Sequence, residues 1–179
     1  MKLLFFSDLH GVLPAAKALL AYAEKLEADQ LIFLGDALYH GPRNGVPGFY
    51  DPAAVAELLN GYADKLLAVR GNCDTEVDQF MLNFPMLADY SQILMPNRRF
   101  FLTHGHMWNA GNPPPLPAGS VLAHGHTHIP EIRKVENFTV FNPGSVALPK
   151  GGFPNSFGFF DGQKLSVRRL SDGEVIFAE

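Results

Sequence analysis

Hydrophobic and polar positions form two alternating patterns in the first part of the chain. Short apolar runs at 3–6, 31–34 and 66–69 each end at a polar turn, which is typical of strands buried on both faces of a sheet. Between them, apolar residues recur at helical spacing after Pro14 and again after Asp51-Pro52, which resembles an N-cap followed by proline at the first helical position. This alternation of strands and helices predicts parallel strand pairing with right-handed crossovers.

The pattern changes in the second half, where short apolar segments follow one another with brief connections. We expect strands near residues 91–94, 100–103, 121–123, 132–135, 139–141, 157–160, 165–170 and 175–178. Asp161-Gly162 suits a tight hairpin. The predicted fold class is α/β, with two packed mixed β-sheets flanked by helices, and we expect the second sheet to be richer in antiparallel strands. The 179 residues, 47% of them hydrophobic, predict a single domain spanning 1–179.

Charge and composition narrow the classes of function. The formal net charge of -4 provides no basic surface for a nucleic-acid backbone, so a small substrate is expected and nucleic-acid binding is not. The apolar run at 3–6 is too short for a signal peptide, and no segment is apolar enough to span a bilayer. Cys73 is the only cysteine, which excludes a disulfide within the chain. We therefore expect a cytoplasmic protein without membrane partners, and a homo-oligomer is compatible with these features.

Polar side chains follow the predicted strands at the point where each strand ends. These clusters are Asp8 with His10, Asp36, Asn72 with Asp74, His104 with His106, and His126 with His128. In open α/β sheets, ligands bind beyond the carboxyl ends of the strands, so we expect the clusters to meet. Residues spaced two apart in extended chain point to one face, which suits His126 and His128 as a ligand pair.

The ligand types predict the kind of metal site. Carboxylate, imidazole and amide oxygen together suit Mn, Fe, Zn or Ni better than calcium or a thiolate site. A single catalytic zinc usually takes three protein ligands, whereas this chain provides about twice that number. The sequence therefore predicts two divalent metal ions.

The order of these motifs resembles that of the calcineurin-like metallophosphoesterase superfamily. The matching motifs are Asp8-x-His10, Gly35-Asp36, Gly71-Asn72-x-Asp74, His104 and Gly125-His126-x-His128, which together span most of the chain. Three stretches are more similar to the bacterial YfcE-type phosphodiesterases of this superfamily. These stretches are Gly71-Asn72-Cys73-Asp74, Gly41-Pro42-Arg43-Asn44 and Asn142-Pro143-Gly144-Ser145.

The resemblance implies a role for each candidate ligand. Asp8, His10 and His128 would hold one metal, and Asn72, His104 and His126 the other. Asp36 would bridge the two ions, for which Mn²⁺ is expected ahead of Fe, Zn, Ni or Mg. The implied reaction is hydrolysis of a small phosphodiester by a metal-activated hydroxide at this dinuclear site. Asp74 would assist by orienting or polarising a neighbour.

Cys73 marks a departure from the wider superfamily. Most members place a histidine after the Gly-Asn pair to assist the leaving group, whereas this chain has Cys73, as YfcE-type members do. We predict that Cys73 donates a proton or hydrogen bond to the leaving group. The alternative is a small buried packing residue, which is the commoner fate of a free cysteine.

Further candidates lie in the long loop of residues 38–50, which is rich in glycine and proline. His40, Arg43 and Asn44 are candidate substrate contacts, because a guanidinium is a natural partner of phosphate. The alternative is a solvated loop without such contacts.

The remaining aromatic candidates lie between the two histidine clusters. His106 is a candidate substrate contact, a partner of a metal ligand, or a buried histidine, and His124 is predicted to be structural. Trp108, with the prolines at 113–115, is a candidate rim over the site.

Two other functions remain open from the sequence. The same ligand set suits a phosphomonoesterase, including a phosphoprotein phosphatase. The small fold also resembles the vacuolar sorting subunit of the retromer coat, which suggests a non-catalytic scaffold, although the intact ligand set argues against that.

Overall fold

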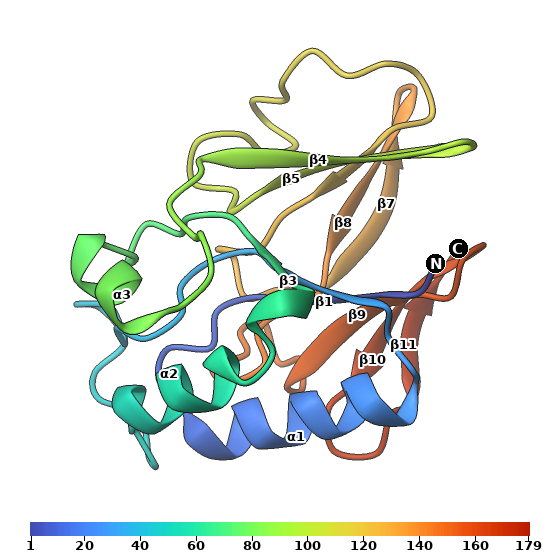
Figure 1. Ribbon diagram of the computed structural model, residues 1–179. Coiled ribbons are helices and arrows are strands. Elements are labelled where there is room, and N and C mark those ends of the chain that lie inside the picture. Colours follow the sequence, from blue (N-terminus) through green and yellow to red (C-terminus); the bar gives the residue numbers. More distant parts are fainter.

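The computed structural model describes residues 1–179 and contains two β-sheets packed face to face (Figure 1). The first sheet has the strand order β11-β10-β9-β1-β2-β3 and the second has the order β4-β5-β6-β8-β7. The strands of the first sheet are β1 (Leu3–Phe6), β2 (Gln30–Phe33), β3 (Leu66–Ala68), β9 (Ser156–Phe160), β10 (Leu165–Arg169) and β11 (Val175–Ala178). Those of the second are β4 (Tyr90–Met95), β5 (Arg98–Thr103), β6 (Val121–Ala123), β7 (Glu131–Val135) and β8 (Phe138–Asn142). Every strand expected from the sequence is present, and two packed mixed sheets are confirmed.

The distribution of antiparallel strands differs from our expectation. β1 pairs with β2 and β2 with β3 in parallel, as predicted. On its other edge β1 pairs with β9 in antiparallel fashion, and β10 and β11 extend this sheet. The first sheet therefore has three antiparallel pairs, against two in the second sheet. The prediction of a second sheet richer in antiparallel strands was wrong, because the last three strands return to β1.

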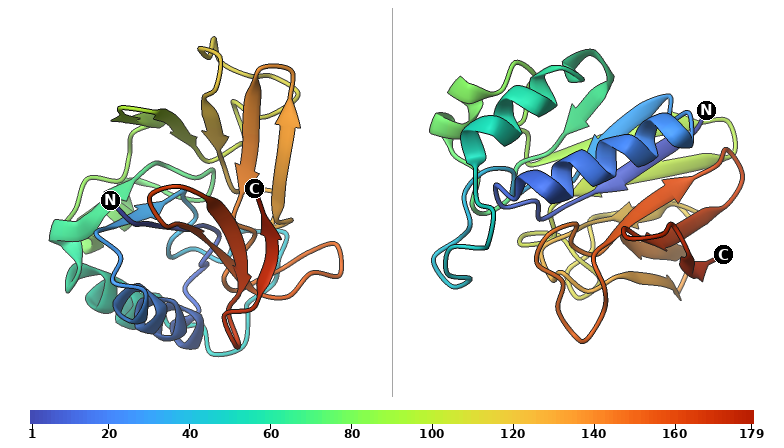
Figure 2. Two further views of the ribbon diagram at one scale, coloured as in Figure 1. Left: turned by 90° about the vertical axis from the view of Figure 1, so that its right-hand side faces the viewer. Right: turned by 90° about the horizontal axis from the view of Figure 1, so that it is seen from below.

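Helices cover the outer face of the first sheet. α1 (Leu13–Lys25) and α2 (Pro52–Asn60) lie side by side against it (Figure 2). Leu4 and Phe6 of β1 point into the core beneath these helices, whereas Leu3 and Phe5 point into the core between the sheets. This alternation follows from the two-residue period of a strand. α1 has 13 residues, and the structure contains no helix with the length and apolar character that a bilayer crossing needs.

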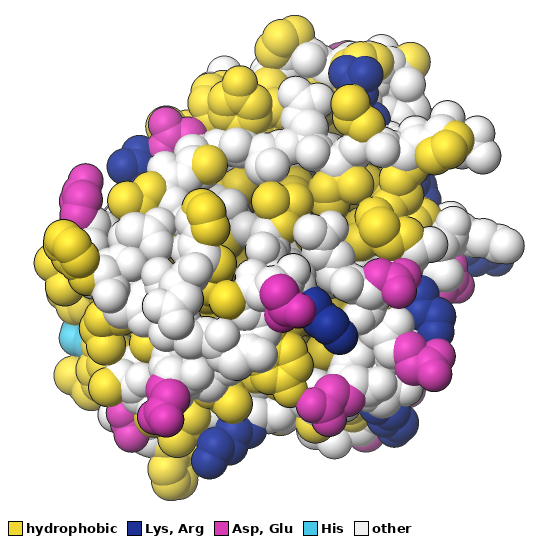
Figure 3. Space-filling model, in the orientation of Figure 1, with side chains coloured by type: hydrophobic (Ala, Val, Ile, Leu, Met, Phe, Trp, Pro, Cys, Tyr) yellow, Lys and Arg dark blue, Asp and Glu magenta, His cyan; other side chains and the backbone are white.

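The third helix, α3 (Glu76–Met81), was not predicted. It begins with a capping box, in which the Thr75 backbone and hydroxyl both donate to Asp78 at 2.8 Å. Val77 and Phe80 of this helix are 69% and 89% exposed, so no apolar periodicity marks it. α3 and the loop of residues 38–50 form the edge of the molecule at the left of Figure 3, where apolar side chains are exposed.

Trp108 packs on the outer face of the second sheet. Its ring contacts Phe101 at a centroid distance of 6.1 Å and Tyr90 at 5.6 Å, both edge-on. Leu116 packs against the same small apolar cluster. The loop that carries Trp108 therefore covers this sheet, and the interpretation of Trp108 as a rim over the site was wrong.

Candidate metal centre

The loops after the strands turn sharply at the candidate ligands. Five of these residues have left-handed backbone conformations, namely Asp8 (φ 55°), His10 (φ 48°), Asp36 (φ 63°), His126 (φ 68°) and His128 (φ 61°). Such conformations cost roughly 1–3 kcal/mol each outside glycine, and they persist only where the surroundings enforce them. Five such conformations at one place lower the stability of the fold, and they direct these side chains to one point.

Two glycines let the loops approach one another closely. A Cβ on Gly71 would overlap the backbone nitrogen and carboxylate of Asp36, and a Cβ on Gly125 would overlap the hydroxyl of Ser7. The glycines of the Gly-Asn and Gly-His motifs therefore have a steric role. They allow the ends of β3 and β6 to contact those of β2 and β1.

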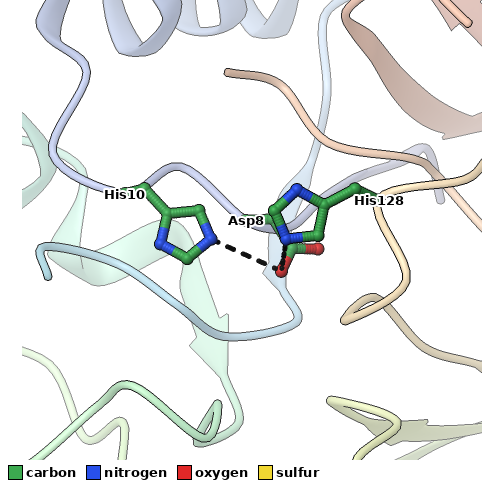
Figure 4. A group of neighbouring side chains, drawn as sticks. All are labelled: Asp8, His10 and His128. Atoms are coloured by element: carbon green, nitrogen blue, oxygen red, sulfur yellow. Dashed lines mark ion pairs between the residues drawn. The ribbon is translucent and has the colours of Figure 1, made fainter. Parts of the chain in front are cut away.

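Asp8, His10 and His128 form the first candidate group. The distance from Asp8 Oδ1 to His128 Nε2 is 3.3 Å, and the distance from Asp8 Oδ1 to His10 Nε2 is 3.9 Å (Figure 4). Asp8 Oδ1 and His10 Nε2 are both buried without a hydrogen-bond partner. A buried polar atom left unsatisfied costs about 1–3 kcal/mol, so each one calls for an explanation. A divalent cation among the three side chains would satisfy both atoms, and the residues present fit such an ion.

A second group adjoins the first through Asp36. Asp36 Oδ2 lies 3.5 Å from His104 Nε2 and 3.7 Å from His10 Nε2. Ligand atoms of Asp8, Asp36 and His104 all lie within 4.8 Å of one another, as do those of the first group. Asn72 Oδ1 lies 3.1 Å from His104 Nε2. Asp36 therefore lies between the two groups, the position that a bridging carboxylate would take.

Backbone carbonyls orient three of the imidazoles. The hydrogen bonds join Nδ1 of His10 to Tyr39 O (2.7 Å), of His104 to Leu34 O (2.7 Å) and of His128 to Leu148 O (2.6 Å). A carbonyl can only accept, so each Nδ1 carries a proton and each Nε2 is the ring nitrogen directed toward the site. Metal-ligating histidines are commonly held in this way.

His126 is fixed through its backbone. Its N–H donates to Asp8 Oδ2 at 3.0 Å, and its ring packs edge-on against His104 with a centroid distance of 5.1 Å. Burial is the main cause that lowers the pKa of His126 and of His128. Both rings are therefore neutral at neutral pH, which is the form that binds a metal.

The carboxylates attract positive charge strongly. Burial lowers the pKa of His104, but the hydrogen bond that its ring donates to Asp36 and the charges of Asp8 and Asp36 outweigh it and raise the pKa to about 9. Burial also opposes ionisation of Asp36, yet interaction with His104 holds the pKa of this carboxyl below its usual value. The same attraction would act on a metal cation in place of the proton.

Asp74 braces the loops that carry the ligands. Its carboxylate accepts three backbone hydrogen bonds, from Asp36 N at 2.7 Å, Ala37 N at 2.8 Å and Gly71 N at 2.7 Å. Burial and then the charge of Asp36 raise the pKa of Asp74 to about 6, against the effect of these donors. The carboxylate faces the backbone and does not line the cavity described below, so its geometry is that of a positioning residue.

The Asn142-to-Ser145 motif supports the site from the opposite side. Ser145 Oγ donates to Asp8 O at 2.8 Å and accepts from Leu148 N at 2.8 Å. Asn142 Nδ2 donates to Gly125 O at 2.9 Å and to Thr127 Oγ1 at 3.0 Å. The motif thus holds the loops of Asp8, His126 and His128, whereas the sequence alone indicated only a turn.

A cavity of about 460 Å³ opens above the candidate ligands, within the usual size of a small-molecule site. It is lined by Asp36, Gly41, Pro42, Arg43, Asn44, Asn72, Cys73, His126, Thr127, His128 and Lys150. Arg43 and Asn44 are therefore placed where a substrate would bind. Lys150 and Thr127 were missed by sequence reasoning, and no motif around Lys150 distinguishes it from a turn residue.

Two of the candidate substrate contacts lie outside this cavity. His40 packs against Tyr39 and Tyr50, and its Nδ1 donates to Gly41 O at 2.8 Å. The ring of His106 lies behind the centre, 5.5 Å from that of His104, and burial lowers its pKa. Neither histidine is among the residues that line the cavity.

His124 is buried under the sheet end, where its Nδ1 donates to Gly125 O at 3.0 Å. This placement agrees with a structural role. His124 is not a member of any of the candidate ligand groups.

Cys73 lies in the wall of the cavity beside the candidate bridge. Its backbone N donates to Asp36 Oδ1 at 2.9 Å, and its Sγ lies 3.3 Å from Asn72 Nδ2. Burial and the charge of Asp36 raise the pKa of the thiol to about 12. Without bound cations the thiol therefore keeps its proton, and its place in the cavity wall would allow it to act as a donor there.

Comparison with known proteins identifies the family. A model of the calcineurin-like phosphoesterase superfamily domain matches residues 1–164. The chain is 50% identical over 176 residues to phosphodiesterase YfcE of Escherichia coli strain K12, covering 98% of this chain and 96% of that protein. The solved structure of YfcE, a phosphoesterase from E. coli, matches with a TM-score of 0.98 at 49% identity, covering 100% of this chain and 98% of that chain.

A more distant structure shares the fold alone. Vps29 of Chaetomium thermophilum matches with a TM-score of 0.61 at 19% identity, covering 100% of this chain and 96% of that one. The predicted resemblance and the predicted hydrolase of phosphoric esters are confirmed by the family match. Members of a metallophosphoesterase family use divalent metal ions, and the grouped carboxylates and imidazoles provide candidate ligands for them. The chain belongs to the calcineurin-like phosphoesterase superfamily.

Proposed function

We propose that this protein hydrolyses a small phosphodiester at a dinuclear metal site. The observation that carries the proposal is a pair of adjoining ligand groups, Asp8 with His10 and His128 beside Asp8 with Asp36 and His104, in which Asp8 Oδ1 and His10 Nε2 are buried and unsatisfied. The choice of a diester is supported by the 50% identity to a phosphodiesterase over nearly the full chain.

Seven residues would hold the two ions. Asp8, His10 and His128 would bind one, Asn72, His104 and His126 the other, and Asp36 would bridge them. Mn²⁺ is the proposed metal, because mixed oxygen and imidazole ligation suits it better than Mg²⁺. When bound, the two cations would lower the pKa of a water to supply hydroxide, and they would neutralise charge on the phosphoryl oxygens.

The chain's own residues orient the reaction around these ions. Asp74 and Ser145 hold the backbone of Asp36 and Asp8 through the hydrogen bonds given above, which fixes the ligand positions. The Cys73 thiol lies in the cavity wall and donates to the leaving group. Arg43 and Asn44 contact the substrate from the loop that forms the mouth of the cavity.

The proposal is tested by comparing a diester with the matching monoester. Protein loaded with Mn²⁺ should show a higher kcat/KM for bis(nitrophenyl) phosphate than for nitrophenyl phosphate. Exhaustive chelation should abolish hydrolysis, and Mn²⁺ should restore it at least as well as Mg²⁺. Metal content is measured at each step to verify removal and reloading.

Three outcomes would contradict parts of this proposal. A clear preference for the monoester would indicate a phosphomonoesterase. Full activity after verified metal removal would exclude the two-metal mechanism. A protein that binds no metal and hydrolyses neither compound would instead fit the scaffold function.

A further inference from the structure

Two basic side chains line the same cavity, and the proposed two-metal reaction does not need both of them. We call Arg43 and Lys150 the rim cations. Both side chains are exposed, and both line the cavity whose inner part is formed by Asp36, Asn72 and His128. They come from separate loops, so their presence at one cavity is a product of the fold.

The loop of Arg43 is attached to the metal centre. His10 Nδ1 donates to Tyr39 O at 2.7 Å, which ties the start of this loop to a candidate ligand. Asn44 Nδ2 then donates to His40 O at 2.9 Å and closes the turn that carries Arg43. Gly41 has a φ of 81° and packs against Cys73 Sγ, where a Cβ would come within 3.3 Å. The loop that carries Arg43 is therefore anchored to the residues beneath it, while the Arg43 side chain itself stays exposed at the cavity.

Lys150 is attached to the other side of the centre. Its backbone N donates to His128 O at 3.2 Å, and its own carbonyl accepts from Phe153 N at 3.2 Å. The backbone of Lys150 is therefore tied directly to a candidate metal ligand, which keeps its side chain at the edge of the cavity.

Neither rim cation has an acidic partner. The ion pairs of the structure engage other basic residues, such as Arg70 with Asp89 and Arg98 with Glu179. Asp36 is the single carboxylate that lines the cavity, and it belongs to the candidate metal centre. In a protein with a net charge of -4, two unpaired cations at one opening form a local site for an anion.

A diester without a second anionic group provides no anionic partner for the two rim cations. Its one anionic phosphoryl group would lie against the metal ions at the inner end of the cavity, which leaves its substituents at the mouth. Guanidinium and ammonium groups bind carboxylate and phosphate oxygens through charge-assisted hydrogen bonds. We infer that the natural substrate is a phosphodiester whose substituent carries a second anionic group, a carboxylate or a phosphate, which Arg43 and Lys150 bind. This inference rests on the proposed phosphodiesterase function and specifies its substrate class.

The test uses symmetric diesters that differ in the charge of their substituents. Bis(2-carboxyethyl) phosphate is compared with its neutral isostere bis(2-carbamoylethyl) phosphate, and bis(2-phosphonoethyl) phosphate distinguishes a phosphate-like group from a carboxylate. Hydrolysis is followed by ³¹P NMR, and each compound is also measured as a competitive inhibitor of nitrophenyl diester hydrolysis. We expect the anionic compounds to exceed the neutral one about tenfold in kcat/KM and in inhibitor affinity, since hydrogen bonds between charged groups are the strong ones. This preference should shrink as ionic strength rises.

Variants connect the preference to the rim cations. Arg43→Gln and Lys150→Gln should each reduce the ratio of anionic to neutral substrate, and the double variant should bring it close to one. Lys134→Gln is the matched control, because Lys134 is an exposed lysine on β7 that does not line the cavity. It should leave both activity and ratio unchanged.

The outcomes separate this inference from the proposed function. If the unaltered protein hydrolyses anionic and neutral diesters equally, the second anion is excluded and the phosphodiesterase stands. If the preference survives in the double variant, the anion binds elsewhere and the assignment to Arg43 and Lys150 is wrong. If only monoesters are cleaved, the proposed function itself fails.

Discussion

The inner and outer parts of the cavity are built in opposite ways. At the inner end, Asp8 and His104 are 0% exposed, and the ligand loops are held by backbone hydrogen bonds in left-handed conformations. At the mouth, Arg43 and Lys150 are exposed, unpaired and free to meet a partner. The difference indicates that the inner part determines the chemistry, which tolerates little displacement, and the mouth determines which substrate enters.

A change at the inner part should have the largest effect. Asp36→Asn should reduce kcat/KM by about 10³-fold, because it weakens two metals at once and removes a principal electrostatic group. His40→Ala is the paired variant, since His40 lies outside the cavity, and it should cost less than about tenfold. Activity and bound metal are measured for both. Near wild-type turnover with two metals in Asp36→Asn would overturn the ligand assignment.

Cys73 lies at the boundary between the two parts, and its effect should depend on the leaving group. Help from a general acid matters most for a basic alkoxide and least for a nitrophenolate. Cys73→Ala should therefore slow dialkyl phosphates by about 10²-fold and nitrophenyl diesters only a few-fold. Rates are compared across leaving groups of different basicity, at equal metal content.

A histidine at this position provides the control. Cys73→His should recover much of the lost rate on alkyl substrates, because imidazole can also donate a proton. Equal slowing of alkyl and nitrophenyl substrates by Cys73→Ala, or no slowing of either, would show that the residue serves packing alone.

Loss of a hydrogen bond that supports a ligand loop should have a smaller effect than loss of a ligand, and the effect should be on metal binding. Ser145→Ala removes the hydroxyl that donates to Asp8 O, and loss of such support should weaken metal affinity by about 10-fold. Ser166→Ala is the matched control, because Ser166 Oγ on β10 donates a buried hydrogen bond to Phe159 O on β9, away from the site. Both variants should lose about 1–3 kcal/mol of stability. Metal titration and thermal unfolding measure the two effects, and equal metal affinity in both variants would refute a positioning role for Ser145.

The sequence was most informative where local pattern and chain topology agree. The runs that became β1, β2 and β3 were visible from apolar periodicity, and the residues after them met as the rule for parallel sheets requires. Asp51 was also predicted as an N-cap, and its side chain accepts from Ala54 N at 3.1 Å. These features depend on neighbours close in sequence or on a general rule of topology.

The features that the sequence did not predict depend on distant or weak signals. α3 was missed because Val77 and Phe80 face solvent, although Thr75 and Asp78 provided a capping-box signal. Lys150 lies at the cavity because its backbone N–H donates to His128 O, and no local sequence pattern predicts this contact. The placement of β9 beside β1 likewise depends on pairing between the two ends of the chain.

The pairing of β1 with β9 has a consequence for synthesis of the protein. β1 lies in the middle of its sheet, where Leu3 pairs with Phe160 of β9. When β1 leaves the ribosome, β9 has not yet been synthesised. At about 5–20 residues per second, a ribosome completes that partner roughly 10–30 s after β1 emerges. During this interval the apolar edge of β1 lacks its neighbour, and the histidines at 126 and 128 arrive late as well. The nascent chain therefore exposes an unpaired strand edge until β9 is made, and its metal centre can assemble only after His128 has been synthesised.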